Sequence, residues 1–210
     1  MATLSTALQP ATPPRPILNA FVQPRGLLGR IGGALMARSL PQQREVADML
    51  TDPGPVLCEL GSGPGAMGAI LAERHPQLQL HLVDPSPTMR SQAGHRCHAW
   101  VQEGRVHISD GTAERLPLPE ESCDTVLAVN SVALWPNLSA GPAEIHRVLR
   151  PGGQVVLSWH SGSAPSGTQR RLALPEATLD TLTDILRPTF DDVDRRDLVH
   201  SILWRASRCA

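Results

Sequence analysis

The stretch ELGSGPGAMG, residues 59–68, directly follows a short apolar run of the chain. A glycine-rich turn after a buried strand is typical of folds in which a strand turns into a helix over a nucleotide. Read from Gly63, the letters GPGAMG match the dinucleotide fingerprint G-x-G-x-x-G. Read from Glu59, the letters ELGSGPG form a second pattern, with an acidic residue before three alternating glycines. The loop alone therefore leaves two registers open, and each implies a different ligand.

Length and composition restrict what the chain does. At 210 residues it is expected to form one domain with a sizeable core, without a disulfide or metal to stabilise it. A formal net charge of −1 argues against nucleic acid as the main partner. There is no apolar run of membrane-spanning length and no signal-like start, so no membrane partner is expected. The four cysteines form no CxxC pair, which favours a cytoplasmic setting, and the oligomeric state is left open.

Two missing residue types exclude several mechanisms. The chain contains neither Lys nor Tyr. Schiff-base catalysis and a Walker loop both require a lysine, and the common short-chain dehydrogenases use a Tyr and Lys pair. None of these chemistries is available to this protein.

The N-terminal quarter differs from the rest in charge. All 20 acidic residues lie at or after Glu45, so the first 44 residues carry only positive charge, as five Arg. We expect a flexible tail at residues 1–16, rich in Ala, Thr and Pro, and a helical cover at 17–50 with helices at 26–40 and 41–50. An Arg-rich, acid-poor segment fits either a cover that attracts an anionic acceptor or a targeting peptide.

From residue 51 to 210, strands and helices alternate. Strands are predicted at 56–60, 79–83, 105–109, 125–130 and 154–159, and helices at 66–74, 87–100, 142–149 and 173–188. The C-terminal stretch DDVDRRDLVHSILWRAS indicates two further strands around a tight turn. This pattern predicts an α/β fold: a doubly wound, mostly parallel seven-stranded Rossmann-like sheet with an antiparallel C-terminal edge hairpin.

Ligands of such sheets bind beyond the carboxyl ends of the strands. The segments at those ends are Glu59 to Gly65, Asp84, Asp110 to Ala113, Asn130 with Ser131, and His160. The carboxylate of Asp84 stands where it can accept hydrogen bonds from ribose hydroxyls. Both registers predict such an acid, so Asp84 does not separate them.

The position of the glycine loop relative to the preceding strand does distinguish the two registers. The dinucleotide fingerprint begins directly after its strand, but here it would leave Glu59 and the Gly61-Ser62 pair unexplained. Four fragments, VLCELGSGPG, LHLVDPS, DGTAERLPLPEESCDTVLAVNSV and EIHRVLRPGGQVVLSW, occur in one order and spacing over residues 42–160. In this the chain resembles the class I S-adenosylmethionine (SAM) methyltransferases of the small-molecule type. A hydride-transfer enzyme has no reason to carry the third and fourth fragments.

The resemblance implies SAM as the cofactor and assigns its contacts. The implied cofactor-binding residues are Glu59, Gly61, Ser62, Gly63, Gly65, Asp84, Pro85, Thr112, Ala113, Asn130 and Ser131. The three glycines would bring the backbone close to the cofactor, where a Cβ atom would collide with it. Glu59 would orient the loop or reach the cofactor's amino group through water, and Asp84 would hold the ribose hydroxyls.

Further along the chain, the resemblance places the backbone N–H of Ala113 at the adenine ring. The backbone carbonyl of Asn130 would accept from the methionine ammonium group. Many relatives have an Asp in place of Thr112, so adenine recognition here is either weaker or taken over by Asp110.

The implied activity is methyl transfer from SAM to a small-molecule acceptor. His160 is the candidate general base, because it follows the fifth strand, and His146 is second to it. No metal site is expected, since His95, Cys97 and His98 lack the third or fourth ligand that zinc prefers. Two alternatives remain: an NAD(P)-dependent oxidoreductase, or a SAM-binding protein without turnover.

Overall fold

A computed structural model of the chain describes residues 40–210. The tail expected at 1–16 and the helix expected at 26–40 lie outside these residues, apart from Leu40. The second helix of the expected cover is α3, Leu40–Met49. Within the described part of the chain, no helix is both long and apolar enough to cross a membrane.

Residues 40–210 form one seven-stranded sheet in the order β3-β2-β1-β4-β5-β7-β6. Its strands are β1 (Val56–Leu60), β2 (Gln79–Val83), β3 (Val106–Ser109), β4 (Cys123–Val129), β5 (Leu149–His160), β6 (Asp191–Asp197) and β7 (Ser201–Ser207). β1 to β5 pair in parallel, whereas β7 runs antiparallel to both β5 and β6. The expected doubly wound sheet and its C-terminal edge hairpin are therefore confirmed.

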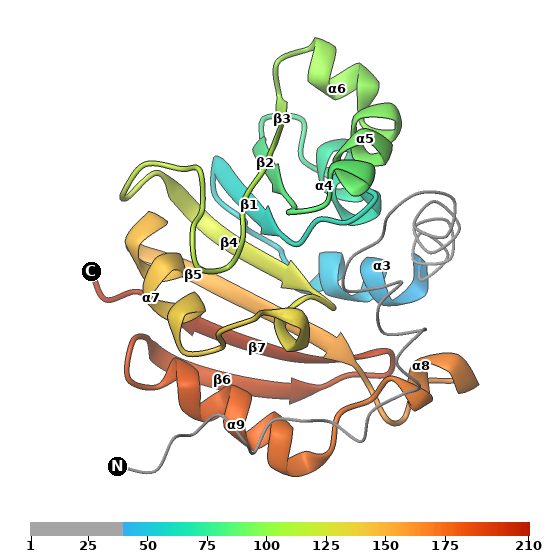
Figure 1. The fold of residues 1–210 in the computed structure, drawn as a ribbon, viewed down its shortest axis with the longest axis vertical. Coiled ribbons are helices and arrows are strands. Elements are labelled where there is room, and N and C mark those ends of the chain that lie inside the picture. Colours follow the sequence, from blue (N-terminus) through green and yellow to red (C-terminus); the bar gives the residue numbers. More distant parts are fainter. Residues whose placement is uncertain (1–39) are drawn as a thin grey trace.

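Helices cover both faces of the sheet (Figure 1). The other helices of the described chain are α4 (Ala66–Arg74), α5 (Pro87–Arg96), α6 (His98–Gln102), α7 (Ala140–Val148), α8 (Gly167–Arg171) and α9 (Glu176–Leu186), with a 3₁₀ turn, η2, at Val132–Leu134. Because side chains alternate along a strand, Leu57 of β1 packs with α3, α4 and α5 on one face. Its neighbour Cys58 packs with α7 and α9 on the other face.

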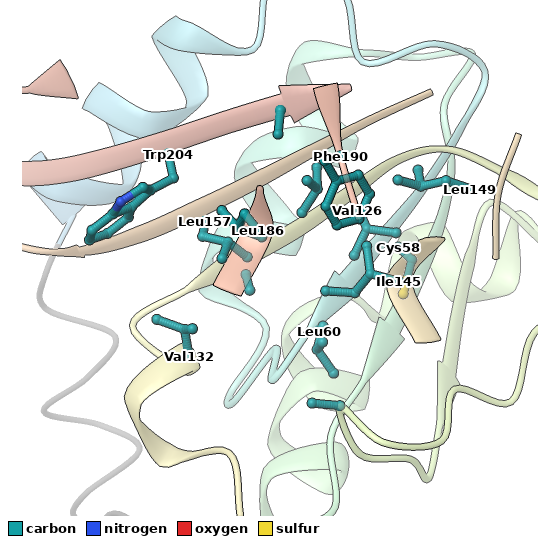
Figure 2. Close-up of a cluster of buried hydrophobic side chains, with 14 of the residues drawn as sticks. Cys58, Leu60, Val126, Val132, Ile145, Leu149, Leu157, Leu186, Phe190 and Trp204 are labelled. Atoms are coloured by element: carbon teal, nitrogen blue, oxygen red, sulfur yellow. The ribbon is translucent and has the colours of Figure 1, made fainter. Parts of the chain in front are cut away.

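The core on the α7 and α9 face contains the largest fully buried side chain, Trp204 of β7. Figure 2 shows Trp204 in one cluster with Leu157 and Leu186. The indole Nε1 donates a hydrogen bond to Oγ1 of Thr183 at 2.9 Å, so burial leaves no polar atom of this side chain unpaired. The hairpin of β6 and β7 thus extends the sheet and also contributes a large side chain to the hydrophobic core.

Three differences from the sequence expectation have a clear structural cause. The helix expected at 87–100 is broken at Cys97, whose side chain turns inward and lies 3.6 Å from the carbonyl oxygen of Gly65. β5 begins at Leu149, because the chain continues in strand pairing through a bulge at Gly152, where φ is +77°. The loop expected at 161–168 leads into α8, which Ser166 caps through the backbone N–H of Gln169.

Candidate functional site

The glycine loop lies at the carboxyl edge of the sheet, tied to the end of β2. The backbone N–H groups of Gly61 and Ser62 donate to the carbonyl oxygen of Val83 at 2.8 and 3.1 Å. The Gly63 N–H donates to Oδ2 of Asp84 at 2.8 Å. The structure therefore joins the loop and the acid after β2 into one unit, as their positions at the strand ends predicted.

Asp84 is almost fully buried within this unit. Its second oxygen, Oδ1, accepts from the backbone N–H of Ser86 at 2.8 Å. Burial raises the pKa of this carboxyl, while the N–H groups of Ser86 and Gly63 and the charge of Arg90 lower it. Each carboxylate oxygen has a second acceptor position, so Asp84 can still accept from a ligand.

The three glycines of the loop are required for different reasons. A Cβ atom on Gly61 would lie 2.5 Å from Cβ of Ser131, and one on Gly65 would lie 2.9 Å from Cβ of Ala93. Gly63 has a φ of +54° and has nothing within 4 Å of its Cβ position among the described residues. Packing within the protein therefore gives Gly61 and Gly65 a reason of their own, beside the expected approach of a cofactor. Of the three, only Gly63 has no described residue near its Cβ position.

Glu59 is buried beneath the first turn of α4. Its Oε2 atom would be 3.3 Å from a Cβ on Gly68, and it has no hydrogen-bond partner among residues 40–210. Burial, followed by the nearby charge of Asp84, raises the pKa of Glu59 to about 8, although the N–H of Gly68 favours the carboxylate. With this pKa the Glu59 carboxyl is mostly protonated at neutral pH, and a positively charged cofactor bound beside the loop would favour its ionised form.

The segment after β4 contacts both the glycine loop and α3. Oγ of Ser131 donates to the carbonyl oxygen of Leu60 at 2.9 Å. Asn130 has a positive φ of +55°, and its backbone N–H donates to the Ser158 carbonyl oxygen at 2.9 Å. Its side chain forms two hydrogen bonds with Gln42, at 3.0 and 2.9 Å. Nothing in the sequence pointed to Gln42, which lies 88 positions away.

The loop after β3 forms a wall of an open groove. Thr112 and Arg115 exchange two backbone hydrogen bonds of 3.1 Å, which turn the loop back on itself and bury Ala113. Asp110 is exposed and pairs with Arg90 at 3.0 Å. The groove has a volume of about 660 Å³ and is lined by Asp110, Gly111, Thr112, Arg115, Leu116, Pro117, Leu118 and Pro119.

His160 is the last residue of β5 and lies inside the protein. It is 7% exposed, and its Nδ1 atom has no partner within residues 40–210. Burial lowers the pKa of its imidazole from 6.5 to about 4, so the ring is neutral at physiological pH. The structure thus places it at the expected edge of the sheet, in a form that can accept a proton.

His146 is not brought to this edge. Nη1 of Arg208, which follows β7, donates to the His146 carbonyl oxygen at 3.0 Å. Because β7 is antiparallel, its end lies at the amino ends of the parallel strands, opposite to His160. The second candidate base therefore lies on the wrong side of the sheet.

The cluster His95, Cys97 and His98 is also separated. Cys97 points into the core, whereas both histidines are exposed. Among the described residues no three His, Cys, Asp or Glu side chains are placed to hold one metal ion.

A methyltransferase domain model matches residues 58–157, the segment that runs from within β1 to within β5 and includes the glycine loop and Asp84. The chain belongs to the class I SAM-dependent methyltransferases. This methyltransferase is 27% identical over 141 residues to the uncharacterized methyltransferase YdaC of Bacillus subtilis (strain 168), covering 67% of this chain and 74% of YdaC. It is 31% identical over 139 residues to the demethylmenaquinone methyltransferase of Deinococcus radiodurans, covering 66% of this chain and 56% of that relative.

Solved structures share the fold of this methyltransferase. One from Methanococcus maripaludis, described as an S-adenosyl-L-methionine-dependent methyltransferase, superposes with a TM-score of 0.71 at 16% identity, covering 85% of this chain and 93% of that one. The family binds SAM or its demethylated product, S-adenosylhomocysteine. Among the described residues nothing lies near the Cβ position of Gly63 and Oε2 of Glu59 has no partner, and both features fit such a cofactor.

Proposed function

We propose that this methyltransferase transfers the methyl group of SAM to a small-molecule acceptor. The observation that carries the proposal is the unit formed by the glycine loop and Asp84, in which Gly63 faces open space beside two buried carboxyl groups. The name of the Deinococcus relative, which refers to a small molecule, supports the class of acceptor. The free thiols of Cys58, Cys97 and Cys123 support a cytoplasmic setting.

The proposed cofactor site follows the edge of the sheet. Asp84 would accept from the ribose hydroxyls with the lone pairs that Gly63 and Ser86 leave free. The Asn130 carbonyl would accept from the methionine ammonium group, and Glu59 would face the same charge through water. The adenine ring would lie by the Ala113 N–H, along the groove with the apolar walls Leu116 and Leu118. Ser62, Pro85, Thr112 and Ser131 complete the proposed contacts.

Methyl transfer from SAM needs little chemical activation by the protein. When bound, SAM supplies a methyl group already activated by its sulfonium charge. The residues around it align the acceptor in line with that methyl and exclude water. Where the acceptor is a hydroxyl or a protonated amine, the neutral imidazole of His160 would take its proton.

The choice of cofactor is tested by calorimetry. We expect SAM and S-adenosylhomocysteine to bind, and NAD not to bind, because Glu59 and Gly61 have a place only in the SAM register. Tight NAD binding would favour the oxidoreductase alternative. Incubation with SAM and a metabolite extract, followed by mass spectrometry, should reveal a product heavier by one methyl group. Cofactor binding without any such product would favour a SAM-binding protein without turnover.

Replacing Asp84 tests the ribose contact. Asp84→Ala should raise the dissociation constant for SAM at least about tenfold, since hydrogen bonds to a charged acceptor contribute about 1.5 to 3 kcal/mol each. The variant should also be less stable, because the N–H groups of Gly63 and Ser86 lose their acceptor. The exposed acid Asp184 is the control, and Asp184→Ala should leave the affinity unchanged. An equal affinity in the two variants would place Asp84 outside the site.

A further inference from the structure

Helix α3 reaches across the carboxyl end of β5 and is held on both sides by polar side chains. On one side, Gln42 pairs with Asn130, which follows β4. On the other side, the Glu45 carboxylate accepts from the His200 N–H at 3.1 Å and from the hydroxyl of Ser201 in β7. Because Ser201 lies opposite His160 in the sheet, these contacts hold α3 over the end of β5.

Gln42 and Glu45 bind parts of the chain that differ in their distance from the glycine loop. Asn130 has a positive φ, a region that non-glycine residues seldom adopt, although Asn tolerates it better than most. The next residue, Ser131, donates to the Leu60 carbonyl and packs against Gly61 at the start of the glycine loop. The segment 130–131 therefore links α3 directly to the cofactor edge, whereas the hydrogen bonds to Glu45 from the described residues come from the start of β7 and the turn before it.

We infer that Gln42 is a positioning residue of the cofactor site, which holds the Asn130 backbone so that its carbonyl faces the cofactor. The inference rests on the proposed contact of that carbonyl with the methionine ammonium group. Gln42 is fully buried, and its amide Nε2 donates to Oδ1 of Asn130 while its Oε1 accepts from Nδ2 of Asn130. Two reciprocal hydrogen bonds hold the Asn130 side chain on α3, while the bond from its N–H to the Ser158 carbonyl holds the backbone at its positive φ.

Such an arrangement couples the docking of α3 to the binding of the cofactor. If α3 must be docked for Asn130 to face the cofactor, then the cofactor must in turn favour the docked helix, because coupling between two sites is reciprocal. The neighbour Gln43 serves as a matched control. It is also a buried glutamine of α3, but its Oε1 has no hydrogen-bond partner among residues 40–210.

The test compares Gln42→Ala, Gln42→Glu and Gln43→Ala with the wild-type chain. S-adenosylhomocysteine affinity is measured by calorimetry, stability by thermal unfolding, and exposure of the α3 amides by hydrogen exchange. Gln42→Ala should weaken affinity about tenfold, consistent with two lost hydrogen bonds. Gln42→Glu keeps an acceptor for the Asn130 amide and should lose less. Gln43→Ala should bind like the wild type.

Hydrogen exchange separates positioning from simple stabilisation. In the wild type and in Gln43→Ala, S-adenosylhomocysteine should slow exchange along α3, and in Gln42→Ala this protection should disappear. A Gln42→Ala variant that is less stable but keeps its affinity and its ligand-induced protection would overturn the inference and leave the proposed function standing. Failure of the wild type itself to bind S-adenosylhomocysteine would overturn both.

Discussion

Replacing His160 with Ala is expected to lower turnover by about 100-fold for an acceptor that must lose a proton, the lower end of the usual contribution of a positioned base, because burial lowers the pKa of this imidazole to about 4 and so weakens it as a base. The side chain lies at the carboxyl end of β5, on the edge that also carries Asp84 and Asn130. Its Nδ1 is buried and has no hydrogen-bond partner in the described part of the chain. SAM affinity should change little, because none of the proposed cofactor contacts uses this ring.

The pH profile of turnover gives a second readout. From the ordinary histidine pKa we would expect activity to fall near pH 6.5, but burial lowers the pKa of His160 to about 4. The acid limb should therefore lie near pH 4 and should be absent in His160→Ala.

The lowered pKa of His160 also makes the stability of the fold depend on pH. The unfolded chain takes up a proton near pH 6.5 and the native ring only near 4, so stability is lost as the pH falls between these values.

His146 provides the matched control for this experiment. It is the second candidate base by sequence, but it lies at the opposite edge of the sheet, where Arg208 contacts its carbonyl. His146→Ala should keep the wild-type rate and its acid limb. A His160→Ala variant with full activity and an unchanged acid limb would mean that His160 takes no part, as expected if the acceptor is a carbon, a sulfur or a neutral amine.

Trp204→Ala is expected to reduce the free energy of unfolding by about 3 to 5 kcal/mol, the usual cost of removing a buried Trp side chain. Trp204 is completely buried and stands opposite Leu157 of β5 in the sheet. Its removal leaves a cavity between the sheet and α9, and it takes away the donor to Thr183. Urea unfolding followed by circular dichroism measures the change.

Trp204→Phe separates packing from the hydrogen bond. Phe keeps an aromatic ring in the cluster but lacks the indole N–H, so this variant should lose clearly less stability than Trp204→Ala. Equal losses would mean that the bond to Thr183, rather than the packing of the ring, accounts for the effect.

The fold was largely predictable from the sequence because its signals are local. The apolar run before Glu59, the glycine turn and the helix after it lie within about twenty residues, and β1, α4 and β2 have the expected bounds. Two of the boundaries that shifted depend on distant contacts. Cys97 breaks a helix because its side chain reaches the glycine loop, and β5 starts early because Leu149 pairs with Cys123.

The residues at the strand ends were predictable for the same reason, because parallel strands bring their carboxyl ends to one edge wherever the chain runs between them. What each residue does there depends on its three-dimensional neighbours. Ser131 and Ala93 make Gly61 and Gly65 necessary, and burial alone lowers the pKa of His160. The pair between Gln42 and Asn130 spans 88 positions. Spacing along the chain carries no information on burial or on contacts over such distances, so only the tertiary structure decided these features.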